Sequence, residues 1–295
     1  RGNVFTLNLH GLRMNQESLH RQGAGYVGKH AADFMFTSDK WFRGIELSYA
    51  PDGSVYVLDW SDIGECHDND GIHRTSGRIY RISYGKTEAA KVDLTEWSND
   101  DLAESVGSPN EWYSRQARQL IQQRAAAGQD LTKAALKLMN TYRLTSSTPT
   151  ALRAMWTLNA IGSADEDWLL GQSNDEREHI RTWALKLLCD QGALSKKTQK
   201  RFIEMAGQDK AGLVQLQLAS ALQQLPLEDR WPLANALVSQ DTFAKDPVFP
   251  LLVWYGINPA VTENRNAALK LVAQCKLPKV RQFIARRLAG EAGKE

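Results

Sequence analysis

The chain has 295 residues, of which 42% are hydrophobic and 24% charged. These proportions are typical of a globular protein and exclude a disordered, collagen-like or disulfide-scaffold chain. The 36 Lys and Arg residues nearly balance the 34 Asp and Glu residues, so nothing indicates a nucleic-acid partner. No apolar run is long enough to predict a transmembrane segment. Because the chain begins with Arg1 and no signal peptide follows, we expect a processed chain or a piece of a longer protein.

The first 86 residues have the alternating hydrophobic pattern of half-buried strands. Strands are predicted at residues 4–9, 45–49, 55–59 and 78–82. Pro51-Asp52-Gly53 predicts a tight turn between the second and third of these strands, because Pro presets φ and Gly permits a positive φ. The last three strands therefore form a predicted meander.

An internal similarity links residues 4–9 to residues 55–60, at an offset of 51 residues. Each copy is followed by a predicted strand that begins near an arginine, Arg13 in the first copy and Arg78 in the second. A repeat of about this length in β-rich sequence is typical of propeller blades. Because a propeller needs about four to eight blades, the remaining blades are expected upstream of Arg1. We therefore predict that residues 1–88 are the C-terminal portion of an incomplete antiparallel β-propeller.

Residues 89–295 change to a helical period, and this half is predicted to be an all-α solenoid of HEAT-like repeats. A plain helical bundle is the alternative. Cys189 and Cys275 lie in the helical apolar pattern and are expected to be buried free thiols. The expected helices are 109–126, 131–142, 148–161, 175–190, 196–206, 212–225, 231–240, 246–257, 264–274 and 278–288.

The predicted strand directions place Arg43, His10 and the loop after residue 59 at one end of the blade. His10 can act as a general base, because the histidine pKa lies near neutrality, or it can be a hydrogen-bonding residue at a strand end. Arg43 follows two aromatic residues and can clamp a carboxylate, a sugar hydroxyl or a quinone. The alternative is a buried arginine paired with Asp39 or Asp59.

The loop at residues 61–73 is rich in groups that bind metals or move protons. Carboxylates favour Ca²⁺ or Mg²⁺, whereas His and Cys favour Zn²⁺ or copper. The spacing does not match an EF-hand, and a solvated loop with Asx turns or a substrate-binding loop are the alternatives. The residues concerned are Asp62, Glu65, Cys66, His67, Asp68, Asp70 and His73.

Several segments resemble one bacterial family. The segments 3–11, 25–30, 41–44, 51–60 and 64–67, with further likeness at 77–82, 213–226, 230–231 and 252–257, carry the resemblance. The family is that of the membrane-bound dehydrogenases of Planctomycetes and Verrucomicrobia, also called PVC-type haem-binding proteins. The resemblance implies a propeller similar to sugar dehydrogenases that use pyrroloquinoline quinone, followed by HEAT-like repeats.

Many members of that family carry a cytochrome c domain with a C-x-x-C-H haem motif, which this sequence lacks, so haem binding is not expected in this chain. The pattern and the resemblance together assign three sets of site residues. Those predicted as catalytic are His10, Arg43, Asp59 and His67. Those predicted to bind substrate are Arg13, His30, Trp41, Trp60 and Cys66, and those predicted to bind metal are Asp62, Glu65 and Asp68.

Two functions are consistent with the sequence. In the first, the chain is a fragment of a periplasmic or otherwise extracytoplasmic dehydrogenase that oxidises a sugar-like alcohol or aldehyde. Electrons would pass to a quinone and then to a cytochrome c partner, with pyrroloquinoline quinone and Ca²⁺ in the full-length parent and no activity in this chain alone. In the second, the chain is a non-catalytic propeller-plus-HEAT module that binds a glycan, or a protein on its helical repeats.

Overall fold

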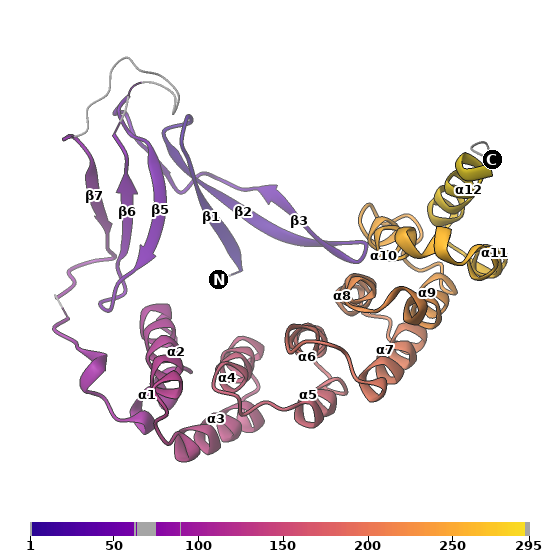
Figure 1. Ribbon diagram of the computed structural model, residues 1–295. Coiled ribbons are helices and arrows are strands. Elements are labelled where there is room, and N and C mark those ends of the chain that lie inside the picture. The colour runs from indigo at the N-terminus through magenta and orange to yellow at the C-terminus, as the bar shows by residue number, and fades with distance from the viewer. Residues whose placement is uncertain (1, 62, 64–74, 89, 293–295) are drawn as a thin grey trace. The chain divides into compact units, whose positions relative to one another are not determined.

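The fold was obtained as a computed structural model that describes residues 2–61, 63, 75–88 and 90–292 (Figure 1). The chain divides into two compact units. The first comprises Arg1–His20, Val27–Leu144 and Arg153–Ile161, and the second comprises Arg21–Tyr26, Thr145–Leu152 and Gly162–Glu295. The first unit therefore holds most of the strand-rich sequence, and the second holds most of the helices.

The described strands form two small antiparallel sheets. One sheet has the order β1-β2-β3, with β4 also paired to β2, and the other has the order β5-β6-β7. In the first sheet Asn3 of β1 lies opposite Ser18 of β2. The strands are β1 (Asn3–Asn8), β2 (Arg13–Gln22), β3 (Gly25–His30), β4 (Met35–Phe36), β5 (Gly44–Tyr49), β6 (Val55–Asp59) and β7 (Arg78–Ile82).

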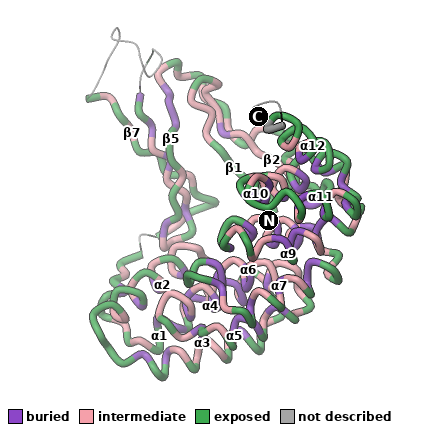
Figure 2. The backbone as a smooth tube through the Cα atoms, turned by 45° about the vertical axis from the view of Figure 1, so that its right-hand side comes forward, coloured by how far each residue is buried: buried purple, intermediate pink, exposed green. Residues whose placement is uncertain are grey.

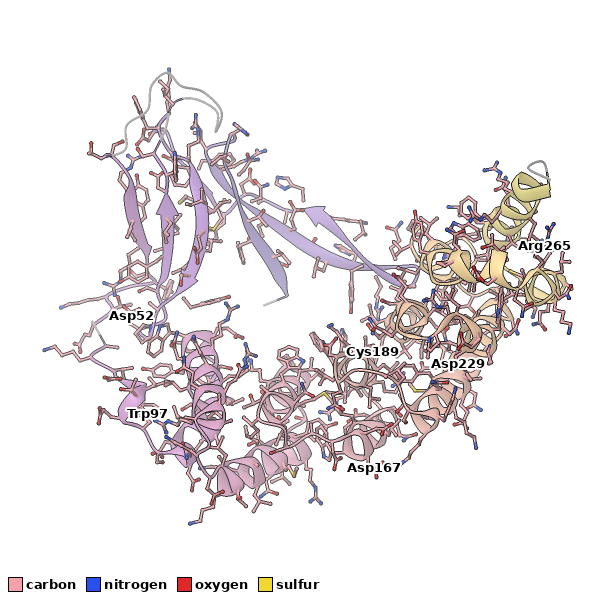
Figure 3. The ribbon with its side chains drawn as sticks, viewed as in Figure 1. Asp52, Trp97, Asp167, Cys189, Asp229 and Arg265 are labelled. Carbon is pink, nitrogen blue, oxygen red and sulfur yellow. The ribbon has the colours of Figure 1, made fainter. Side chains whose placement is uncertain are left out.

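The predicted meander is confirmed in β5, β6 and β7. The turn between β5 and β6 is closed by the Ala50 N–H, which donates to the Ser54 carbonyl at 2.9 Å, and Gly53 has a φ of 82°. Asp52, labelled in Figure 3, accepts the Ser54 N–H at 2.9 Å and pairs with Arg81 of β7. This turn therefore fixes the register of two strands and is anchored to the third.

The core between the strands is small. Its fully buried members are Met14 of β2, Phe42 and Val57 of β6, and β1 contacts β5 where the two sheets meet. Partly buried apolar side chains complete the cluster, namely Leu7, Leu12, Met35, Leu47 and Ile82. So few buried side chains give little hydrophobic stabilisation, so polar interactions also matter for the order of this region.

The predicted propeller is wrong. The described strands form two sheets of three and four strands, with no closed or propeller-like arrangement among them. The internal similarity misled because its two copies have different environments: β1 is an edge strand paired with β2, whereas β6 is the central strand of the other sheet. Alternating apolar residues mark a half-buried strand, and they do not determine the sheet in which that strand lies.

Helices follow from Leu94 to the C-terminal end of the described chain. Short 3₁₀ turns lie at Leu94–Glu96, Leu222–Gln224 and Leu227–Asp229. The α-helices are α1 (Asn99–Ser105), α2 (Glu111–Ala126), α3 (Thr132–Leu144), α4 (Thr148–Ala160), α5 (Glu166–Gln172), α6 (Glu178–Asp190), α7 (Lys196–Gln208), α8 (Gly212–Ala221), α9 (Arg230–Val238), α10 (Phe249–Glu263), α11 (Arg265–Gln274) and α12 (Pro278–Ala292). Side-chain caps such as Ser98, Asn110, Asp165 and Ser195 bind free N–H groups at helix starts.

Helices of the second unit pack in two rows. The helices α6, α8, α10 and α12 contact one another in succession, as do α5, α7, α9 and α11, and neighbours in sequence pack between the rows. This packing is that of stacked helical hairpins and agrees loosely with a solenoid. Cys189 and Cys275 are buried free thiols, as predicted, and burial raises the pKa of Cys189 to about 11.

The tip of the β2–β3 hairpin belongs to the second unit, where Asp246 holds it. The buried Asp246 carboxylate accepts the Ala24 N–H at 2.7 Å and also the N–H groups of Val248 and Phe249 at the start of α10. Gly212, the first residue of α8, leaves room for this contact, because a Cβ there would overlap the Ala24 backbone. One carboxylate thus caps a helix and binds a loop that is 222 residues away in sequence.

Side chains of the same hairpin tip contact α6. Arg21 forms an ion pair with Glu178, and its guanidinium lies 4.5 Å from the centre of the Tyr26 ring. Tyr26 stacks on His179, and its hydroxyl lies 3.2 Å from His179 Nε2. The His179 pKa lies below its ordinary value, first because burial disfavours the imidazolium and second because the Arg21 guanidinium repels it.

Replacing Asp246 by Asn is expected to reduce the free energy of unfolding by about 2 kcal/mol, because the amide oxygen can serve α10 while its NH₂ group faces the Ala24 N–H and leaves a buried donor unpaired. Urea denaturation measures the loss, and hydrogen exchange should show faster exchange at Ala24 than at Val248 and Phe249. Asp241→Asn, the same exchange at an exposed position, is the control. An equal loss in both variants would contradict the assignment.

Lowering the pH is expected to weaken the docking of the hairpin tip, residues 21–26, against α6. In the released tip His179 titrates near its ordinary value of 6.5, so the released state binds a proton more readily than the docked state. Docking is therefore fully stable above about pH 6.5 and weakens as the pH falls toward the lowered pKa. Amide protection of residues 21–26, corrected for intrinsic exchange, should fall between pH 7.5 and 5.5. His179→Asn should remove this dependence, whereas His20→Asn, at an exposed histidine, should retain it.

Candidate functional site

Asp59, a predicted catalytic residue, lies at the centre of a buried polar network at the end of β6. Its Oδ1 accepts the N–H groups of Arg43 at 2.7 Å and Ser61 at 2.9 Å. Its Oδ2 accepts Arg78 Nε at 2.9 Å and lies 2.7 Å from a second nitrogen of the same guanidinium. A fully buried carboxylate with these donors is satisfied by its own chain.

Arg43, the second predicted catalytic residue in this network, is nearly buried. Its guanidinium donates to three carbonyl oxygens: Lys40 at 3.0 Å, Phe42 at 2.9 Å and Ile63 at 2.9 Å. The sequence alternatives included an arginine paired with Asp39 or Asp59. Arg78 forms both of those ion pairs, whereas Arg43 reaches Asp59 only through its backbone N–H.

The directions of the pKa shifts within the network agree with these hydrogen bonds. The pKa of Asp39 is lowered by the Trp41 N–H and then by Arg78, and the pKa of Arg78 is raised, first by its hydrogen bond to Asp39. The Trp41 N–H donates to Asp39 at 2.9 Å, so Asp39 holds the segment before β5. The network therefore orders the chain at the ends of three strands.

The remaining residues predicted at this end of the sheet are less enclosed. Trp60 donates its N–H to the Arg43 carbonyl at 2.8 Å, and the residue is 64% exposed. His10 is exposed in the turn between β1 and β2. The structure thus brings Arg43, Asp59 and Trp60 together, while His10 belongs to the other sheet.

A second cluster contains Arg13 and His30, both predicted to bind substrate. Asp33 accepts from Arg13 at 3.2 Å, and its other oxygen lies 3.3 Å from His30 Nε2. The opposite ring nitrogen of His30 lies 3.0 Å from Glu17 Oε1. This half-exposed histidine is therefore flanked by two carboxylates, an arrangement that orients an imidazole for proton transfer.

Glu17, Asp33 and Arg78 were missed by the sequence interpretation as site residues. Asp33 follows His30 by three residues, which was the one local signal. Glu17 meets His30 because β2 lies beside β3, and Arg78 meets Asp59 because the β6–β7 register places them opposite each other. Both contacts arise from strand pairing, which cannot be predicted from a local sequence motif.

The predicted loop residues Asp62, Glu65, Cys66, His67, Asp68, Asp70 and His73 lie outside the described residues. Among the residues that the structure describes, no group of three His, Cys, Asp or Glu side chains is arranged to hold a metal ion. The described residues also do not fit a quinone clamp at Arg43, because that guanidinium already binds three carbonyls. No helix in the described part of the chain is both long and apolar enough to cross a membrane.

Comparison with known proteins gives a match for the strand-rich part of the chain. A family model described as a domain of unknown function (DUF7133) matches residues 2–86. No curated protein matches the chain. The matched segment contains all seven described strands and every residue predicted for the site, and its description assigns no activity.

Replacing Asp59 by Asn is expected to destabilise the strand-rich region by about 3 kcal/mol, because the Arg78 guanidinium then loses a buried counter-ion and one N–H acceptor changes to a donor. Denaturation followed by tryptophan fluorescence measures the change. Glu46→Gln, the same type of exchange at an exposed position of β5, should have little effect. Equal stability of Asp59→Asn and the unmutated chain would show that the network is not structural.

Proposed function

We propose that this chain is a non-catalytic binding module that takes an extended segment of a partner polypeptide onto the free edge of β7. The observation that carries this proposal is the exposure of large apolar side chains beside that edge. Ile79 is 70% exposed, Tyr80 is 37% exposed and Tyr84 is fully exposed. Figure 2 shows exposed and intermediate residues along β7.

The edge of β7 supports this choice of partner. Within the described strands β7 pairs only with β6, so its other edge has backbone N–H and C=O groups in a row. An extended backbone matches such a row, whereas a sugar or an apolar helix does not. Because successive strand residues point to opposite faces, Ile79 and Tyr80 offer apolar contacts on both faces of an added strand.

The engagement of Arg43 and Asp59 also supports a binding role. Both residues hold backbone and ion-pair partners within their own chain, and substrate would have to displace these bonds. By contrast, an added strand at β7 breaks no described interaction. A glycan, the other partner considered from the sequence, would need a row of exposed polar side chains, which β7 does not offer.

The binding proposal is tested with a displayed library of octapeptides selected against the purified chain. Enriched peptides should alternate apolar and polar residues, bind in fluorescence anisotropy and protect the β7 amides from exchange. Ile79→Lys should weaken binding at least about tenfold, because a lysine at an edge opposes strand addition. Leu144→Lys, at a leucine that is 85% exposed on α3, is the matched control.

Three outcomes would overturn this proposal. They are the failure of any peptide to be enriched, equal binding by Ile79→Lys, and binding of glycans instead of peptides by the same surface. Circular dichroism of both lysine variants shows whether either has lost its fold.

A second candidate is the extracytoplasmic dehydrogenase implied by the family resemblance, with a quinone acceptor, Ca²⁺ and a cytochrome c partner in the longer parent protein. The observation that favours it is His30 between Glu17 and Asp33, since oxidation of an alcohol requires a base to take the hydroxyl proton. Dye reduction by the parent protein with sugars, pyrroloquinoline quinone and Ca²⁺ tests it. Turnover that falls at least about a hundredfold in His30→Gln supports this candidate, and absence of turnover eliminates it.

A further inference from the structure

The helix α2 of the first unit and the helix α4, which lies in that unit from Arg153 onward, carry an unbalanced charge. Together they contain four arginines and a single acidic residue, Glu111. The arginines are Arg115, Arg118 and Arg124 on α2 and Arg153 on α4. Because α4 has no acidic residue, Glu111 is the one carboxylate on these two helices that can pair with a guanidinium.

Two of these arginines have complete internal partners. Arg124 donates to the carbonyls of Trp97 and Thr95, both at 2.8 Å. Arg153 forms an ion pair with Glu111 and donates to the Ser108 carbonyl at 3.1 Å. These bonds tie α2 and α4 to the segments before them, so Arg124 and Arg153 have structural roles.

Arg115 and Arg118 are used differently. The nearest acid to Arg115 is Glu111, already paired with Arg153, and the Arg115 Nε lies 3.9 Å from its second oxygen. Arg118 is half-buried, and no carboxylate of the described residues lies within ion-pair distance of it. The pKa of Arg118 is lowered by burial and then by the charge of Arg115. A half-buried cation without a counter-ion costs free energy, which an incoming anion would recover.

Aromatic rings orient both guanidinium groups. The Arg115 guanidinium carbon lies 5.6 Å from the centre of the Tyr49 ring, and that of Arg118 lies 5.8 Å from the centre of the Trp156 ring. A guanidinium held over a ring face keeps its N–H edge available for two parallel bonds to an oxyanion. The two arginines are three residues apart, so they lie on one face of α2 about 5–6 Å from each other.

We propose that Arg115 and Arg118 form a binding site for the carboxylate side chains of an acidic peptide segment. Two guanidinium groups one helical turn apart match two carboxylates that follow closely along a chain. Each carboxylate accepts a pair of N–H bonds from one arginine. The exposed Tyr49 ring borders the site and contacts the apolar part of the peptide. The two arginines lie on α2 and not at the β7 edge, so the test of this site is independent of the test of strand binding.

The test uses the whole chain and a fluorescein-labelled octapeptide of glutamate, with the glutamine octapeptide and inorganic phosphate as comparisons. The glutamate peptide should bind, and binding should weaken as salt rises, because exposed charges are screened. The glutamine peptide should not bind. Binding of the glutamine peptide, or displacement of the glutamate peptide by phosphate at equal charge concentration, would overturn the assignment to peptide carboxylates.

Variants separate a ligand-binding role from a structural one. Arg118→Gln and Arg115→Gln should each weaken binding of the glutamate peptide about tenfold or more. The affinity of Arg118→Lys should lie between those of the unmutated chain and Arg118→Gln, since lysine keeps the charge and loses the planar fork. Lys133→Gln removes the same charge from an exposed position of α3 and should change the affinity less than about twofold.

Thermal unfolding supplies the second readout. Arg118→Gln should not lower Tm, because it removes a charge that has no internal counter-ion, and the glutamate peptide should raise the Tm of the unmutated chain. A lower Tm with unchanged affinity would show that Arg118 is structural and overturn the proposal. Equal loss of affinity in Lys133→Gln would also overturn it. Arg115→Gln, at a more exposed side chain, gives the same test should Arg118→Gln fail to fold.

Discussion

The buried carboxylate of Asp59 connects the parts of the strand-rich region that surround its small hydrophobic core. Only Met14, Phe42 and Val57 are fully buried in the cluster between the sheets. Asp59 joins β6 to β7 through Arg78 and to the segment before β5 through the Arg43 N–H. It also holds Ser61 at a φ of 56°, a conformation that residues other than glycine seldom adopt. A polar network of this kind gives a unique arrangement to strands that little apolar packing would specify.

Several arginines of the chain bind backbone carbonyls, whereas others, such as Arg78 and Arg81, pair with carboxylates. Arg43, Arg124 and Arg230 each donate to carbonyl oxygens near the end of a strand or helix. Such bonds satisfy acceptors that secondary structure leaves free. Arg115 and Arg118 differ from these arginines, because the contact described for each guanidinium is with an aromatic ring and not with a backbone carbonyl. That difference separates arginines that build the fold from arginines available to a ligand.

Local patterns predicted the local structure well. The alternation at residues 45–49 and 55–59 and the Pro51-Asp52-Gly53 turn gave β5 and β6 within a residue of their observed bounds, and Leu/Ala periodicity gave ten of the longer helices. The helices α1 and α5 were missed because each has only seven residues, too few for a clear period. The start of the strand β2 was predicted near Arg13, but its length was not, because its sequence, RMNQESLHRQ, is largely polar and shows no clear alternation.

Contacts between segments that are distant in the chain could not be predicted from local sequence patterns. Whether β1 belongs with β2 or in a propeller blade depends on pairing, and an internal similarity of six residues could not decide it. The partner of His30 depends on β2 lying beside β3, and the acceptor for the Ala24 N–H lies in the last quarter of the chain. Arg43 and Asp59, both named from the sequence, lie together at the end of β6, but their bonding depends on donors and acceptors that no local spacing reveals.

The position of the hairpin tip has an evolutionary consequence. The segment matched by the family model, residues 2–86, includes the tip, yet the tip is seated on Gly212 and Asp246 among the helices. A recombination event that moved this segment next to unrelated helices would leave the Ala24 N–H without its acceptor, and any side chain in place of Gly212 would collide with the loop. Residues 2–86 should thus be inherited together with a compatible start of α8 and α10, and the two parts of the gene should change in concert.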